Sequence, residues 1–344
     1  MLTRSFGANG QFQLTDWTEE LNVIPNQWGT IRSLGLFIEE PVTQHSVTFE
    51  EITRDGGLLI DRVRGDRNTV NKDDTRKLHV FSVPHFPHDD YIMPQDIQGQ
   101  RAYGSPDQAE TLAAVRMRKM ERIRQNHAWT LERSRAQILT AGTVYAPSGT
   151  VTQNWFTEFG VTQKTVDFVF GTATTEIIAK IEEAIAHIQD NIGNGGVVTG
   201  VVGLCSPTFF AKLISHPTVK AAYQYYTSSQ EPLRNRLTAG SSSAALQRRF
   251  IYGGVEFIEM RDNYAGTQLI TAGDCVFVPT GTDAFRTYFS PANKFGLVNT
   301  LGEQVYMFEY EAPTGDKITL ESESNFVNAC MRPYGAIVRG FSST

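Results

Sequence analysis

The feature that most constrains the fold is one long amphipathic segment, from Ser105 to Gly142. Ser105 suits the N-cap of a helix, Pro106 suits the first helical position, and Gln108 completes a capping box. Gly142 suits the C-terminal cap, so we predict a spine helix over about 106–140, a rod roughly 50 Å long. The apolar stripe is narrow, which predicts a helix that lies on a surface. Its members recur at helical spacing and are Ala113, Met117, Met120, Ile123, Leu131 and Ile138.

The middle of this predicted helix is basic, which leaves two interpretations. The face either contacts nucleic acid or is solvated and ion-paired with acidic neighbours. The chain carries a formal net charge of -6, which does not favour binding to nucleic acid as a whole. No aromatic ladder accompanies the basic residues, so base stacking is not indicated. We favour the ion-paired face, whose principal members are Arg116, Lys119, Arg122 and Arg124.

Residues 43–94 are typical of a long two-stranded excursion. "HSVTFEEIT" alternates apolar and polar positions, "RDGG" supplies turn residues, and "LLIDRVRG" and "KLHVFSVPHF" favour further strand. Between them, "GDRNTVNKDDTRK" is charged and almost without apolar residues, so we expect a solvent-facing tip or a contact surface. The candidate contact residues of this tip are Arg62, Arg64, Arg67, Lys72, Asp73, Asp74, Arg76 and Lys77.

The first 41 residues carry apolar side chains without a sustained period, separated by Gly and Pro. We expect an N-terminal arm that buries these side chains against the rest of its own chain or against a neighbouring molecule. The candidates for arm contacts are Trp28, Ile31, Leu34 and Phe37.

The rest of the chain alternates between strand and helix patterns. Residues 144–170 predict a hairpin around the turn "APSG". A second helix should follow, capped by Thr174 or Thr175 and ended by Gly193. Residues 197–299 predict an α/β lobe, and the tail returns to strands that we expect to pair with residues 144–170. The stripe predicted for the second helix is Ile177, Ile181, Ile185 and Ile188.

No arrangement in the sequence predicts catalysis, a cofactor or a metal. In "HFPHDD", Pro84 and Pro87 favour extended backbone, where His85 and His88 point to opposite faces, so we expect a polar strand end. "GNGGVVTG" follows a helix and precedes a strand, the reverse of a phosphate-binding loop. The three cysteines are far apart and odd in number, which favours a reduced cytosolic setting, and without a CxxC pair they encode neither a zinc ribbon nor a thioredoxin-type site. Cys205 should be a packed thiol.

Neither a secretory signal nor a membrane span is expected. "MLTRSFGANGQF" has no apolar run behind its positive charge. The most apolar stretch, "GGVVTGVVGLCSPTFFAKLI", is interrupted by Gly, Thr, Ser and Pro, and predicts a buried strand, a turn and a helix.

Three long stretches, taken in order, resemble the major capsid proteins of tailed phages with the Hong Kong 97-like fold, and more narrowly the lambda-type E family. They are "FSVPHFPHDDYIMPQDIQG", then "YGGVEFIEMRDNY" with "ITAGDCVFVPTGTDAFRTYF", and finally "VYMFEYEAPTGDKITLESESNFVNACMRPYGAIVRG". The similarity covers nearly the whole chain.

The resemblance implies an α+β fold with four regions. These are an N-terminal arm over residues 1–43, an extended β-hairpin loop over 44–94, a peripheral domain with the spine helix over 95–191 and 302–344, and an axial α/β domain over 192–301. The spine helix would then be the stiff beam of a thin, shell-forming subunit.

The resemblance further implies a structural protein, not an enzyme, that assembles as hexamers and pentamers into an icosahedral head enclosing the genome. Its partners would be other copies of itself, a scaffold protein and a portal during assembly in the host cytoplasm, possible decoration proteins, and double-stranded DNA through weak non-specific contact. Some relatives join Lys to Asn covalently, here Lys72 or Lys77 to Asn325 or Asn328, but this branch is not expected to. The alternatives are an encapsulin-like nanocompartment shell and a soluble α/β enzyme.

Overall fold

A long strand, β16 (Ile318–Cys330), organises the larger of the two main sheets. The computed structural model describes residues 2–6, 12–23, 29–53, 75–98, 111–151, 153–193, 198–224, 248–261, 263–264 and 267–344. The first half of β16 lies between β15 and β6, and its second half pairs with β14. The described strands of this sheet run β1-β2-β15-β16-β14-β3, with β6 also on β16. Their bounds are β1 Leu2–Phe6, β2 Phe12–Asp16, β3 Ile38–Pro41, β6 His85–Ile92, β14 Phe285–Phe289 and β15 Tyr306–Glu311.

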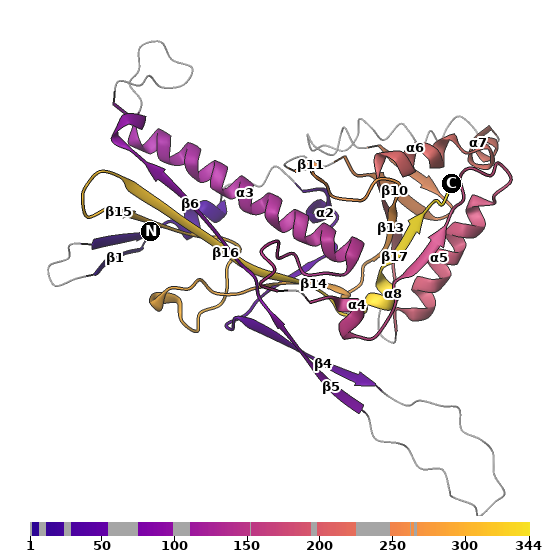
Figure 1. Ribbon diagram of the computed structural model, residues 1–344, viewed down its shortest axis with the longest axis horizontal. Coiled ribbons are helices and arrows are strands. Elements are labelled where there is room, and N and C mark those ends of the chain that lie inside the picture. Colours follow the sequence, from indigo (N-terminus) through magenta and orange to yellow (C-terminus); the bar gives the residue numbers. More distant parts are fainter. Residues whose placement is uncertain are drawn as a thin grey trace, which may run out of the picture.

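The spine helix α3 (Leu112–Ala141) packs along this sheet (Figure 1). It ends as predicted, with Gly142 in the left-handed conformation at φ 63°. It starts at Leu112, because Thr111 has extended backbone and its hydroxyl accepts a hydrogen bond from the Ala114 amide. The predicted cap and first turn, Ser105 to Gln108, lie outside the described residues.

The buried face of α3 is broader and more polar than the predicted stripe. Met120, Ile123, Leu131 and Ile138 are buried as expected. Ala113 is exposed and Met117 half-exposed, because Val115 is the residue of the first turns that faces the sheet. Polar side chains are also enclosed, so the helix is inserted more deeply than a surface helix. They are Arg124, His127, Glu132, Ser134 and Arg135.

A smaller six-stranded sheet forms the other lobe of the described chain, in the order β7-β17-β13-β8-β10-β9. Phenylalanine, isoleucine and valine side chains join it to α5 (Ile177–Asn191) and α6 (Pro207–Ser215) in one core cluster. The most apolar stretch of the sequence forms strand β8, a turn and helix α6, as predicted. No helix in the described ranges is long and apolar enough to cross a membrane. The strand bounds are β7 Lys164–Asp167, β8 Gly200–Cys205, β9 Arg249–Tyr252, β10 Val255–Glu259, β13 Cys275–Thr280 and β17 Val338–Phe341.

Helix α5 confirms most of the second predicted helix. Ile177, Ile181 and Ile188 are buried, and Ile185 is partly buried. Its N-cap is Glu176, which makes no side-chain capping bond, so the prediction of Thr174 or Thr175 is wrong. The Thr175 hydroxyl instead donates to the Val169 carbonyl.

The hairpin predicted over residues 144–170 is present only as a short one around "APSG", where the Gly149 amide donates to the Ala146 carbonyl and an isolated antiparallel bridge joins Thr143 to Asn154. The described residues that follow form the short helix α4 (Trp155–Glu158) and strand β7. The pairing stops at Trp155, which begins a helix and whose large apolar ring is completely buried against Phe81. The expected pairing with the tail is present in one place, where β17 runs parallel to β7.

The sheets divide the chain differently from the predicted domain boundaries. β7, α5 and β17 were expected in the peripheral domain, but they pair with or pack on strands of the predicted axial domain. β14 was expected in the axial domain, but it pairs with β16 in the larger sheet. Strand pairing over long sequence separation, which local patterns do not encode, causes both differences.

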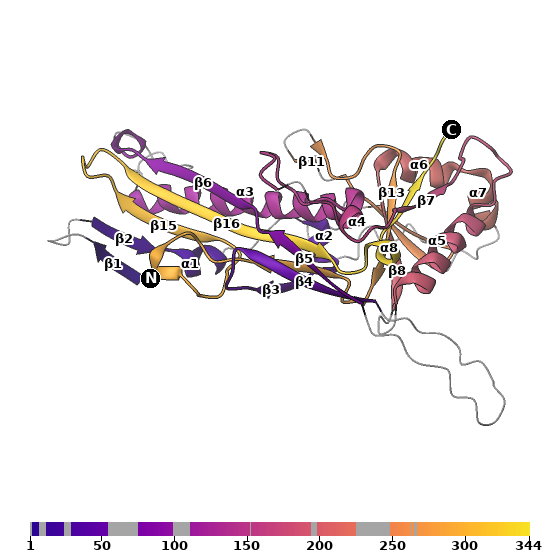
Figure 2. The same cartoon turned by 60° about the horizontal axis from the view of Figure 1, so that its bottom comes forward.

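The hairpin of β4 (Ser46–Thr53) and β5 (Thr75–Ser82) projects from the body (Figures 1 and 2). Strand β6, predicted within the same extended loop, belongs to the larger sheet instead. Figure 2 shows the molecule as a flat, elongated body, with the hairpin crossing in front of its middle. The remaining described elements are α1 Thr18–Val23, α2 Thr30–Ser33, η1 Pro94–Asp96, α7 Pro217–Gln224, β11 Asn263–Tyr264, β12 Thr267–Gln268, η4 Phe295–Leu297 and α8 Pro333–Ala336.

Candidate functional site

The two faces of the β4–β5 hairpin have different environments. On the inner face, Val47, Phe49 and Phe81 are buried against the body of the same chain. Phe49 meets Phe81, Trp155 and Tyr288 at ring distances of 5.5, 5.3 and 5.6 Å. The base of the hairpin is therefore fixed by an aromatic cluster.

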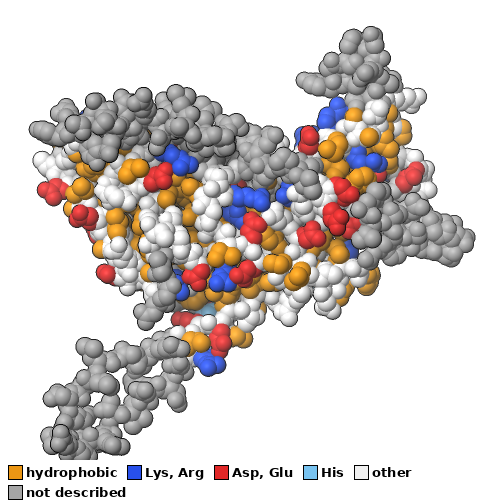
Figure 3. Space-filling model, turned by 180° about the vertical axis from the view of Figure 1, so that it is seen from behind, with side chains coloured by type: hydrophobic (Ala, Val, Ile, Leu, Met, Phe, Trp, Pro, Cys, Tyr) orange, Lys and Arg blue, Asp and Glu red, His pale blue; other side chains and the backbone are white. Residues whose placement is uncertain are grey.

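The outer face of the hairpin is apolar but exposed. The strand register places Thr48 opposite Val80 and Glu50 opposite Leu78, so these pairs share the face away from the body. Leu78 is 67% exposed and Val80 51% exposed. Figure 3 shows hydrophobic and charged side chains side by side where the hairpin leaves the body. We define this outer face as the surface formed by Ile52, Arg76, Leu78 and Val80.

The structure describes only the base of the predicted charged tip. Arg76 and Lys77 are exposed, and Arg76 lies 3.4 Å from Glu50 across the hairpin. That ion pair is solvated on both sides, so it contributes little to stability. The other candidates lie outside the described residues: Arg62, Arg64, Arg67, Lys72, Asp73 and Asp74.

Of the two alternatives for the arm, contact with a neighbouring molecule is wrong for Ile31 and Phe37, and burial against the same chain is right. Ile31 and Phe37 are buried in the core of their own chain, so neighbouring copies are not needed to cover them. Leu34 is partly buried against the same cluster, and Trp28 lies outside the described residues. Strand β2 also pairs with β15 of its own sheet.

Buried polar contacts hold this segment on the spine helix. A carboxylate oxygen of Glu132 accepts a 2.6 Å hydrogen bond from the Ile31 amide. Arg135, almost fully buried, donates to Glu39 at 2.8 Å and to Thr287 at 3.1 Å. Burial raises the pKa of Glu39, but the hydrogen bond and charge of Arg135 outweigh it and hold that pKa below its ordinary value. The apolar pattern of the sequence does not indicate this attachment, because its anchors are charged.

The basic face of α3 is largely used inside the molecule. Arg116 lies 2.7 Å from Glu309, and Lys119 lies 2.9 Å from Asp90. Arg124 is buried and donates to the side chains of Asn22 and Gln304. Burial, then repulsion from Arg32, lowers the pKa of Arg124 to about 10. Arg122 is exposed. These contacts support the ion-paired interpretation over a nucleic-acid-binding face.

A second exposed apolar surface, not predicted from the sequence, lies between β14 and β15. Phe295 is 100% exposed, Val298 63% and Leu301 61%. We call this surface the Phe295 loop. Its signal in the sequence was the unperiodic "ANKFGLVNTLG", where four large apolar side chains stand among Asn and Gly.

The Phe295 loop is anchored at both ends. Lys294 pairs with Glu321 at 2.7 Å and lies over the Phe308 ring, and the Asn293 amide donates to Glu323. At the other end, a Cβ on Gly302 would overlap the Phe289 carbonyl, so only glycine allows this close approach. Anchored ends present the apolar side chains on a fixed platform.

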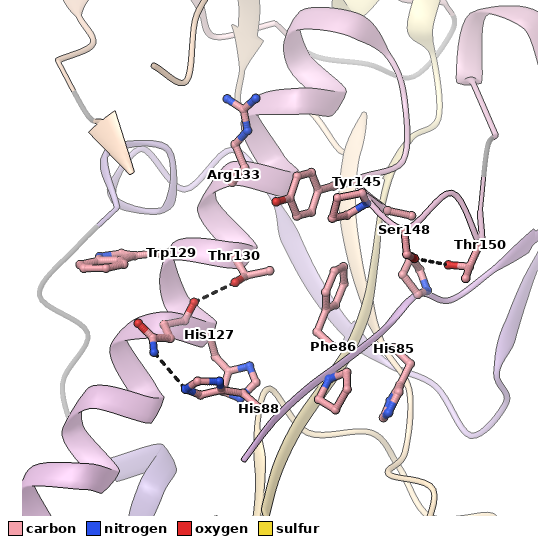
Figure 4. A pocket seen from close by; sticks show the side chains of 15 residues that line it. His85, Phe86, His88, His127, Trp129, Thr130, Arg133, Tyr145, Ser148 and Thr150 are labelled. Carbon is pink, nitrogen blue, oxygen red and sulfur yellow. Dashed lines mark hydrogen bonds between the residues drawn. The ribbon is translucent and has the colours of Figure 1, made fainter. Parts of the chain in front are cut away.

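A pocket of about 640 Å³ lies between β6, α3 and the loop around Ser148 (Figure 4). His85 and His88 lie on opposite sides of β6, as predicted. His85 is 2.7 Å from Asn325 Oδ1, and His88 is 3.0 Å from Asn126 Nδ2. Burial, then the charges of His88 and Arg124, lowers the pKa of His127 to about 3, which keeps that ring neutral at physiological pH.

The pocket's histidines therefore have separate partners instead of one shared ligand position. Within the described ranges, no group of three or more His, Cys, Asp or Glu side chains is placed to hold a metal ion. The candidate cross-linking amides are also enclosed, since Asn325 and Asn328 are both buried. The Asn325 amide donates to the Pro291 carbonyl and that of Asn328 donates to Ser134.

Comparisons with known proteins match nearly the whole chain. The family model described as phage major capsid protein E matches residues 13–341. The major capsid protein of Pseudomonas phage KPP10 is 47% identical over 341 residues, which cover 96% of each chain. The major capsid protein of Salmonella phage Felix O1 is 30% identical over 359 residues, covering 97% of this chain and 96% of that protein.

Solved structures share the fold at low sequence identity. The capsid of Ralstonia phage GP4 superposes with a TM-score of 0.51 at 12% identity, covering 94% of this chain and 93% of that one. A structure from Gordonia phage Cozz gives a TM-score of 0.50 at 14% identity, covering 93% and 88%.

Proposed function

Because this chain belongs to the phage major capsid protein E family and forms the shell of a tailed-phage head, we propose that two exposed apolar surfaces join its copies. The surfaces are the outer face of the β4–β5 hairpin and the Phe295 loop. The single observation that carries the proposal is the exposure of large apolar side chains on rigidly anchored supports, Leu78 on one and Phe295 on the other.

The hairpin surface fits a contact with a second copy of this chain. Soluble proteins seldom expose contiguous apolar side chains without a partner. The inner aromatic cluster fixes the hairpin base, so little conformational entropy is lost when the outer face is covered. Arg76 beside the apolar side chains would select the register of that contact through charge.

The Phe295 loop lies on a different part of the chain from the hairpin, which favours heterologous contacts. In such contacts unlike patches meet, and repetition of the contact closes a ring when the rotation allows. Rings of six and five copies would build the icosahedral head, so we propose hexamers and pentamers. The extended loop of the family is then assigned to residues 46–82, shorter than the predicted 44–94.

Other partners follow from the family resemblance alone. We propose that a separate scaffold protein and a portal act during assembly in the host cytoplasm, and that a decoration protein joins the shell. Packaged double-stranded DNA would meet the inner wall only through weak, non-specific contacts. The net charge of -6 and the internal pairing of Arg116 and Lys119 support that weakness.

The family membership favours a phage-head shell over an encapsulin-like compartment and over a soluble enzyme. Because the members of this family are structural proteins, we propose that the function is assembly of a shell and not catalysis.

The test replaces exposed apolar side chains by charge and measures assembly. Leu78→Asp and Phe295→Asp should each prevent closed shells when the protein is expressed with its scaffold, as seen by sedimentation and electron microscopy. Leu78→Met and Phe295→Leu are matched controls that keep the apolar surface and should assemble. Circular dichroism must show folded subunits for all four. Normal shells from both Asp variants would overturn the proposal.

A further inference from the structure

Two cysteines face each other at the centre of the smaller sheet. Strands β8 and β13 are antiparallel neighbours, and their register places Cys205 directly opposite Cys275. The two Sγ atoms are 3.1 Å apart, and both residues are completely buried. Their positions are separated by 70 residues along the chain. The third cysteine, Cys330, is also completely buried but belongs to a different core cluster.

The sheet leaves room for these sulfurs. A Cβ at Gly203 would lie 3.4 Å from Cys275 Sγ and closer still to the Phe257 ring. The missing side chain at Gly203 therefore creates the space in which the sulfurs meet. The Cys205 thiol also donates a hydrogen bond to the Gly203 carbonyl at 3.7 Å.

We infer that Cys205 and Cys275 form an oxidisable dithiol, which a small hydroperoxide converts into an intrachain disulfide. A disulfide bond is about 2.0 Å long, so the sulfurs must approach by only about 1 Å. Residues directly opposite on antiparallel strands have Cβ atoms about 4.5–5.5 Å apart, so a small approach of the two strands reaches the roughly 3.5–4.5 Å of a disulfide. No rearrangement of the strand order is required.

The chemistry balances with hydrogen peroxide as the oxidant. One thiolate attacks a peroxide oxygen, the O–O bond breaks, hydroxide leaves, and a sulfenic acid forms. The other sulfur attacks that sulfenic sulfur, an S–S bond forms, and the S–O bond breaks with loss of water. Two thiols lose two electrons and two protons in total, and the peroxide is reduced to two waters.

The environment makes this reaction selective for small oxidants. Burial, then the hydrogen bond and charge of Cys205, raises the pKa of Cys275 well above its ordinary value, which disfavours its thiolate. Bulky thiol reagents cannot reach a fully buried sulfur in the folded sheet. The disulfide should therefore form slowly, and in the folded protein only with a water-sized oxidant.

The product would tie β8 to β13 across the segment that contains β9 and β10. Such a cross-link restricts the unfolded chain, so the smaller lobe should unfold at a higher temperature after oxidation. A head assembled in a reducing host and released into an oxidising medium would acquire this restraint without any new contact.

The experiment counts free thiols in the full-length protein. Folded protein is treated with hydrogen peroxide, quenched with catalase, denatured, alkylated and weighed by intact mass spectrometry. Untreated protein should carry three alkyl groups, one for each cysteine. Oxidised protein should carry one, on Cys330, and should lose two hydrogens without gaining oxygen. Digestion without reductant should yield the Cys205 peptide joined to the Cys275 peptide.

Matched variants separate the pair from general oxidation. Cys330→Ala should lose two alkylation sites on treatment, as the unaltered chain does, whereas Cys275→Ala should lose none to a disulfide. Three alkyl groups after treatment, or addition of oxygen in place of the linked peptide, would contradict the inference. If Cys275→Ala fails to fold, the linked peptide from the unaltered chain still decides the question.

Discussion

The Phe81 ring stacks on the Trp155 indole with centroids 3.9 Å apart and planes 9° from parallel. The contact joins strand β5 of the projecting hairpin to helix α4 of the body, and both side chains are completely buried. Because Leu78 lies on the same strand but faces solvent, the hairpin separates two roles. One face secures it to its own chain, and the other is available to a neighbouring copy.

Removing the stacked ring should release the hairpin. Phe81→Ala should lower the free energy of unfolding by about 3–5 kcal/mol, since it leaves a large cavity beside Trp155 and Phe49. Leu78→Ala is the matched control and should change the stability of the unassembled subunit by less than about 1 kcal/mol. Chemical denaturation followed by tryptophan fluorescence measures both. Equal losses for the two variants would refute the division of faces.

The end of the spine helix should depend on Gly142 for two reasons. Its φ of 63° is left-handed, and an added Cβ would overlap the Phe156 ring. Gly149 also has a left-handed φ, 73°, but has open space around it. Gly149→Ala should therefore cost only the backbone strain, about 1–2 kcal/mol. Gly142→Ala should cost about 1–3 kcal/mol more because of overpacking. Equal melting temperatures of the two variants would contradict this.

The buried guanidinium of Arg135 should be essential to the attachment of β3. Arg135→Met removes charge-assisted hydrogen bonds to Glu39 and Thr287, and because Glu39 keeps access to water the cost should be about 1.5–3 kcal/mol. Arg122→Met, on an exposed turn of the same helix, is the control and should be close to neutral. Urea denaturation midpoints measure the difference. A small effect at Arg135 would show that water replaces it there.

Acid should weaken the same attachment. The folded-state pKa of Glu39 lies below its ordinary value of 4.5, so its carboxylate stabilises the fold above pH 4.5. That stabilisation is lost as the pH falls below 4.5 through the folded-state pKa. Glu39→Gln removes it at neutral pH and should flatten the pH dependence of the denaturation midpoint in that acidic range. Glu121→Gln, an exposed carboxylate on α3, corrects for the change in net charge. If the denaturation midpoints of Glu39→Gln and the unaltered chain depend on pH in the same way, Glu39 is not the source of the acid sensitivity.

Local sequence signals predicted the elements whose structure is set locally. The end of α3 follows from Gly142, and the buried isoleucines of α5 follow from their helical spacing. The extended backbone of β6 follows from Pro84 and Pro87, which also separate His85 from His88. In each case the determining residues lie within a few positions of the element they form.

The errors arise where distant residues decide. From the local sequence, Trp155 is predicted to lie in a strand. In the structure its ring packs against Phe49 and Phe81 of the β4–β5 hairpin. Ile31 and Phe37 look like unpartnered apolar residues because Glu132 and Arg135, which hold their segment in place, lie about a hundred positions away. The pairing of Cys205 with Cys275 depends on strand order in the same way, and no local pattern reports it.

The most direct test of the account is a cryo-electron microscopy reconstruction of the assembled shell at side-chain resolution. We predict that Leu78 and Val80 of one copy, and Phe295 of each copy, are covered by neighbouring copies, while Ile31 and Phe37 stay buried within their own chain. Shells in which Leu78, Val80 and Phe295 all remain open to solvent would contradict the assignment of these surfaces.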